Sequence, residues 1–248
     1  MRDRTASRLA WGLWAVNLTL LGAGGVMAVL GRHRPGDLAL SILIPALTLT
    51  SATVGALIAS RHPRNPIGWL FLGMGSVWGI AGLGTGVASL AAAGIIPVTG
   101  VVRVADWVGS WVYIPGVIIP VTFLFLLFPD GHLPSRRWRW VAGAAVAAVV
   151  VICAETALGP GPLADAVVLR GNPFAVGDRA AWDVVGSVAW ITAIGCIVSS
   201  AVAMFGRFRR ASGEVRQRIA WLAYGSIAVA VLFLTAAIGF FTTETLGR

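Results

Sequence analysis

The chain has 248 residues, of which 57% are hydrophobic and only 12% are charged. Soluble domains are on average about 25% charged, so this chain has too little polar surface to cover a soluble core and is predicted to lie in a membrane. The formal net charge is +9, and every basic residue is an arginine. These arginines occur in short clusters between apolar runs, so we expect a lipid bilayer with anionic headgroups as the partner rather than nucleic acid.

Apolar runs long enough to cross a bilayer recur along the whole sequence. A membrane helix needs about 20 predominantly apolar residues. The first run is too long for a cleaved signal peptide, and we interpret it as a retained first span. The sequence therefore predicts one all-α domain over residues 1–248, a polytopic membrane helical bundle with about seven transmembrane helices. The expected spans are residues 9–30, 38–60, 67–93, 107–128, 141–158, 184–206 and 219–242.

The distribution of arginines predicts the orientation of the bundle. If the N-terminus is cytoplasmic, thirteen of the nineteen arginines lie in inner segments, the largest group just before the last span. Cytoplasmic loops carry an excess of Arg and Lys, so we expect a multi-pass plasma-membrane protein with a cytoplasmic N-terminus. Arg32 and Arg34 are exceptions to this rule, because they lie in the first outer connection.

The three inner connections each contain a turn and a helix-start signal. Asn65 and Pro66 are a cap and a first-turn proline for the third span, and Ser135 is the expected cap of the fifth. In the third connection, Glu214 and Arg218 have the spacing of a helical ion pair. We expect these loops to couple the helices to one another. The candidate residues are Asn65, Pro66, Pro129, Asp130, Gly131, Arg136, Arg137, Arg139, Glu214 and Arg218.

Inside the spans, small residues and prolines indicate close packing and bends. Gly75 and Gly79 have the G-x-x-x-G spacing, as do Gly82 and Gly86. This spacing lets helices approach closely in lipid, and we prefer packing within the bundle over a homodimer face. Asn17, in the first span, is expected to make an interhelical hydrogen bond. Pro45, Pro115 and Pro120 are expected to bend their helices.

The sequence contains no recognisable catalytic, cofactor or metal motif. The three histidines lie in loops without a metal-ligand spacing, and there is no nucleophile elbow or phosphate-binding loop. The acidic residues Asp106, Glu155 and Asp183 are expected near the outer face, where they either ring a pocket or are solvated at the interface. The outer segment 159–182 is expected to cover the mouth of the bundle.

Three segments together resemble the membrane portion of actinobacterial two-component sensor histidine kinases. They are R-H-P-R-N-P-I-G-W-L (residues 61–70), L-F-P-D-G-H-L-P-S-R-R-W-R-W (127–140) and R-R-A-S-G-E-V-R-Q-R-I-A-W-L (209–222), with N-P-F at 172–174. The resemblance implies a membrane-embedded sensory or anchoring domain, partnered with a histidine kinase and response regulator. It covers roughly residues 58–222.

This chain differs from that family in one informative respect. It has no phosphoacceptor histidine box and no ATP-binding box, so none of the family's catalytic residues carries over and the sequence leaves enzyme activity open. Seven spans starting inside would also place Arg248 outside. Two alternatives remain, a small-molecule transporter or channel and a membrane scaffold; the first needs a polar path that the apolar spans do not provide.

Overall fold

The computed structural model describes residues 2–31, 38–214, 216–217, 220–221 and 224–225. Within these residues the fold is all helical, and six helical segments are long and apolar enough to cross a membrane. The predicted all-α multi-pass bundle is therefore confirmed to this extent. The predicted seventh span, residues 219–242, lies almost wholly outside the described residues. The helices are α1 (Arg2–Leu30), α2 (Leu38–Arg61), α3 (Pro66–Ala92), α4 (Gly100–Gly109), α5 (Ile114–Leu127), α6 (Trp138–Leu158) and α7 (Arg179–Arg210).

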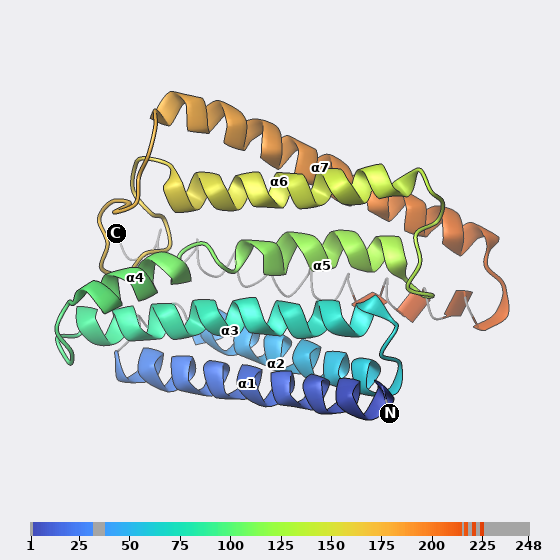
Figure 1. The fold of residues 1–248 in the computed structure, drawn as a ribbon, viewed down its shortest axis with the longest axis horizontal. Coiled ribbons are helices and arrows are strands. Elements are labelled where there is room, and N and C mark those ends of the chain that lie inside the picture. Colours follow the sequence, from blue (N-terminus) through green and yellow to red (C-terminus); the bar gives the residue numbers. More distant parts are fainter. Residues whose placement is uncertain (1, 32–37, 215, 218–219, 222–223, 226–248) are drawn as a thin grey trace.

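The long helices lie side by side along the long axis of the molecule, with α1, α2 and α3 on one side and α6 and α7 on the other (Figure 1). Helix α5 lies between the two groups and packs on α3, α6 and α7. One core cluster joins α1, α2 and α3 around Leu72; the other joins α5, α6 and α7 around Ile152. Because the chain reverses between successive candidate spans, alternate connections between them meet at the same end of the bundle.

Around its apolar core the bundle exposes many large apolar side chains, and it buries several polar ones. Val29, Ile191 and Val202 are 78%, 71% and 63% exposed, whereas Asn17 and Thr48 are buried. Both buried polar side chains are satisfied within the bundle, as lipid requires. Asn17 of α1 donates to the Leu72 carbonyl at 3.1 Å and accepts from Ser76 of α3 at 3.0 Å, which confirms its predicted interhelical hydrogen bonds.

Several glycines of α3 face neighbouring helices inside the bundle. A side chain at Gly75 would collide with Asn17, and one at Gly86 would collide with the backbone of Gly24 in α1. On another face, Gly84 lies against Gly109 of α4. The G-x-x-x-G pattern therefore serves the internal packing that the sequence favours, because only glycine allows backbones to come this close.

The fourth span differs from its prediction of residues 107–128. The helical segment starts at Gly100, breaks at residues 110–113 and restarts as α5, and the candidate crossing runs over Gly100–Leu127. Pro115 lies in the first turn of α5, where its missing N–H costs nothing. The bend expected from this proline is thus a complete break, whereas Pro45 and Pro120 lie inside continuous helices.

Candidate functional site

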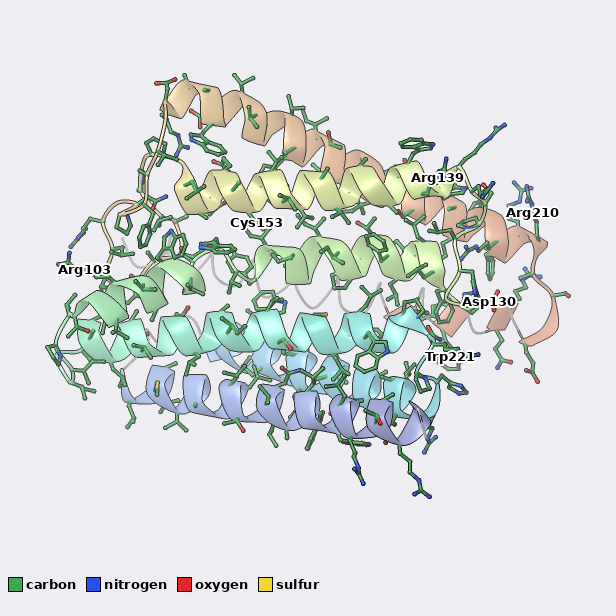
Figure 2. All side chains as sticks on the ribbon, in the orientation of Figure 1. Arg103, Asp130, Arg139, Cys153, Arg210 and Trp221 are labelled. Atoms are coloured by element: carbon green, nitrogen blue, oxygen red, sulfur yellow. The ribbon has the colours of Figure 1, made fainter. Side chains whose placement is uncertain are left out.

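The connections between α2 and α3 (residues 62–65) and between α5 and α6 (residues 128–137) meet at one end of the bundle, together with the last turn of α7. We call this the arginine-rich end. Figure 2 shows Asp130, Arg139 and Arg210 at this end and Arg103 at the opposite one. Many of its arginines are exposed, namely Arg4, Arg61, Arg64, Arg136, Arg137, Arg139, Arg209, Arg210 and Arg216. The charge at this end is therefore strongly positive.

The start of α3 is built as the sequence predicts. Asn65 has an extended backbone, its side chain accepts a hydrogen bond from the Ile67 amide at 3.0 Å, and Pro66 occupies the first turn. The next connection packs directly on this cap. Gly131 has a φ of +75°, and a β-carbon there would lie 3.0 Å from both Asn65 Oδ1 and Pro66 Cδ. Glycine is required at this position by the left-handed backbone and by the contact.

Arg207 of α7 ties the same connection to the last long helix. Its guanidinium donates to the backbone carbonyl of Phe128, and also to that of His132 at 2.8 Å. Arginine suits this role because its planar fork carries several donors in a fixed geometry. Residues from α3, from the 128–137 connection and from α7 thus form one contact network, which we call the Arg207 network: Asn65, Pro66, Phe128, Gly131, His132 and Arg207.

The structure brings some of the predicted coupling residues together and separates others. Asn65, Pro66 and Gly131 belong to the Arg207 network, and Pro129 and Asp130 lie on the loop that Arg207 holds. Sequence reasoning missed Arg207, whose only signal was that it is the first charge after a long uncharged run. Arg218 lies outside the described residues, so the predicted pair with Glu214 stays a prediction.

The predicted cap at Ser135 is wrong. Helix α6 begins at Trp138 with Arg137 at the cap position and no side-chain cap. The Ser135 carbonyl instead accepts from the Trp138 amide at 3.1 Å, so the chain makes a turn before the helix starts. Arg136 and Arg137 are exposed at the helix start, and Arg139 stacks its guanidinium over the Trp140 ring at 5.3 Å.

At the opposite end, Asp106 of α4 holds the long connection between α6 and α7. Its buried carboxylate accepts three backbone hydrogen bonds, from Val167 and Val168 at 2.8 Å and from Leu169 at 2.9 Å. Asn172 fastens the same connection to the end of α6 by donating to the carbonyls of Ala157 and Gly159. Residues 159–178 are therefore a folded cap on this end of the bundle.

The three acidic candidates have different surroundings. Asp106 is committed to the backbone of the 159–178 connection, and Asp183 forms an exposed ion pair with Arg179 at 2.8 Å. Glu155 lies on α6 against Gly186 of α7, where an added β-carbon would lie 3.0 Å from Glu155 Cγ. Within the described residues the three carboxylates share no hydrogen bond, and no group of His, Cys, Asp or Glu has a metal-binding arrangement.

No protein-family model, curated protein or solved structure matches this chain. The fold and the distribution of apolar surface define a multi-pass helical membrane protein, and the resemblance to sensor kinases stays a prediction.

Removing the Asn65 cap tests the local structure of the Arg207 network. Asn65→Ala should lower stability by about 1 kcal/mol, the usual value for losing such a cap, because the Ile67 amide loses its acceptor. Arg64→Ala, one residue earlier and exposed, is the matched control and should change stability by less than about 0.5 kcal/mol. Thermal unfolding in detergent measures both, and equal losses would contradict the cap assignment.

Proposed function

We propose that this chain is the membrane-embedded sensory or anchoring part of a two-component signalling system, placed in the plasma membrane with its arginine-rich end in the cytoplasm. The orientation is supported by the excess of arginine at that end. The signalling role is supported by the position of the three resembling segments, since residues 61–70, 127–140 and the first part of 209–222 all lie at this end.

The observation that carries the proposal is the Arg207 network. A sensory membrane domain must pass a rearrangement of its helices to a partner at the membrane surface, and this requires the helix ends to move together. Arg207 binds the 128–137 connection, which in turn rests on the Asn65–Pro66 start of α3. A shift of α3 or α5 is therefore transmitted to α7 by direct contact.

The downstream element in this proposal is a histidine kinase, acting with a response regulator. The kinase receives the movement where α7 ends and the chain continues past Arg210. The sequence has no phosphoacceptor histidine box and no ATP-binding box, so this proposal assigns catalysis to the partner or to a kinase core encoded with this chain. The gene sequence beyond the Arg248 codon tests this point. An adjacent or in-frame kinase core is the expected finding, and the absence of both would contradict the two-component assignment.

Substitution of Arg207 tests the coupling itself. With Cys153 and Cys196 replaced by alanine, spin labels at Arg64→Cys and Ser135→Cys report the distance between the two connections in the full chain. Arg207→Gln should broaden this distance distribution, because glutamine's single amide group cannot reproduce both guanidinium contacts. Arg210→Gln, three residues further on and exposed, is the control. Indistinguishable distributions for wild type and Arg207→Gln would show that Arg207 does not hold the loop.

A further inference from the structure

A lateral groove runs between α6 and α7 and is open at the surface of the bundle. It encloses about 430 Å³ and is lined on α6 by alanine and valine and on α7 by valine, alanine and Thr192. Val184 and Val188 on its wall are 65% and 60% exposed, which shows that the groove is open to its surroundings. Thr192, its only hydroxyl, donates to the Val188 carbonyl at 2.7 Å, so the groove offers no free polar group and suits an alkyl chain.

About one turn of α6 before the groove, toward the arginine-rich end, lies a cationic and aromatic pair, Arg139 and Trp140. The α6 wall of the groove consists of Ala144, Ala147, Ala148 and Val151, which follow Trp140 at helical spacings of four, seven, eight and eleven residues. Trp140 therefore lies on the same helix face. It is 72% exposed, and the Arg139 guanidinium lies over its ring. Tryptophan prefers the depth of the lipid headgroups, and arginine binds phosphate in a bidentate way.

The length of this face matches one leaflet. From Trp140 to Val151 the helix rises about 16 Å, at 1.5 Å per residue. Half of the hydrocarbon core of a bilayer is about 15 Å thick. A phospholipid with its phosphate at Arg139 would thus extend an acyl chain along the whole groove and end near its far limit.

We propose that the groove between α6 and α7 is a binding site for one anionic phospholipid, whose phosphate is bound by Arg139 beside Trp140. The positive charge of Arg136, Arg137 and Arg139 selects an anionic headgroup over a zwitterionic one. The alkyl chain fills the apolar groove and covers the exposed side chains of Val184 and Val188. This site is independent of the two-component assignment, since it requires only that the bundle lies in a bilayer.

Native mass spectrometry of the full chain in detergent tests the site, with phosphatidylglycerol and phosphatidylcholine as probes. We expect one phosphatidylglycerol to remain bound under conditions that remove phosphatidylcholine. Arg139→Gln should weaken this binding about fivefold, which corresponds to about 1 kcal/mol. Arg103→Gln, at the opposite end of the bundle (Figure 2), should leave it unchanged.

A second pair of variants tests the groove. Ala147→Phe places a ring in the space of the alkyl chain and should also reduce phosphatidylglycerol binding. Val150→Phe is the control, because Val150 is 60% exposed on α6 and does not line the groove. Equal retention of the two lipids by the wild type would overturn the proposal. Unchanged phosphatidylglycerol binding in Ala147→Phe would also overturn it. If Ala147→Phe kept its lipid binding but converted a dimer to a monomer, the groove would instead hold a second copy of the chain.

Discussion

Replacing Asp106 with alanine should release the 159–178 connection from α4 and cost about 3 kcal/mol or more of stability. The carboxylate is buried and accepts the amides of Val167, Val168 and Leu169. Hydrogen bonds to a charged group contribute roughly 1.5–3 kcal/mol each, and donors left unpaired in a buried site carry a desolvation penalty. Contributions within one such cluster are not additive, so the expected loss is not the sum of three separate bonds.

Hydrogen exchange of the three amides, together with thermal unfolding in detergent, measures the effect. The amides should exchange much faster in Asp106→Ala. Their exchange rates in Asp106→Asn should be intermediate, because asparagine has one side-chain oxygen where the carboxylate uses both of its oxygens to accept the three amides. Asp183→Ala is the matched control, since that carboxylate forms an exposed ion pair with Arg179 and such pairs contribute at most about 1 kcal/mol. If the two alanine variants lost equal stability, the 159–178 connection would not depend on Asp106.

Replacing glycine with alanine should change stability differently at two positions of α3, Gly84 and Gly73. At Gly84 a methyl group would overlap the carbonyl oxygen of Ala105 and lie 3.1 Å from the backbone of Gly109. Backbone atoms cannot rotate away, so α3 and α4 must separate, and overpacking of this kind costs about 1–3 kcal/mol or more. We expect Gly84→Ala to lose stability near the upper end of that range.

Gly73→Ala is the control on the same helix. Gly73 is exposed and has open space around the position of a β-carbon. Alanine there should be neutral or stabilise α3 by up to about 1 kcal/mol, because glycine has the lower helix propensity. Thermal unfolding of both variants in one detergent measures the contrast. Equal stability of the two variants would show that α3 and α4 do not pack through Gly84.

Local features of the sequence predicted local features of the structure. The third and fifth spans were expected at residues 67–93 and 141–158, and they are Pro66–Ala92 and Trp138–Leu158. The Asn65 cap could be predicted because the residue that caps and the amide it satisfies are two positions apart. The break between α4 and α5 could not be predicted, because apolar residues continue through it. Hydropathy alone does not distinguish a bend in a helix from a break.

The two ends of the bundle depend on contacts between distant parts of the chain. Arg207 binds a carbonyl 79 residues earlier, and Asp106 binds an amide 61 residues later. No spacing rule connects such pairs, because their approach follows from how the helices pack. The sequence therefore indicated that inner loops and outer carboxylates were candidates, while their actual partners required the fold.

The most direct test of the proposed placement in the membrane is cysteine labelling in intact spheroplasts. In a chain with Cys153→Ala and Cys196→Ala, single cysteines replace Arg64 or Arg210 at the arginine-rich end and Arg103 or Arg170 at the other. We expect a membrane-impermeant maleimide to label positions 103 and 170 in intact cells, and positions 64 and 210 only after lysis. Labelling of 64 and 210 in intact cells would contradict the cytoplasmic location of the Arg207 network, and with it the proposed signalling function.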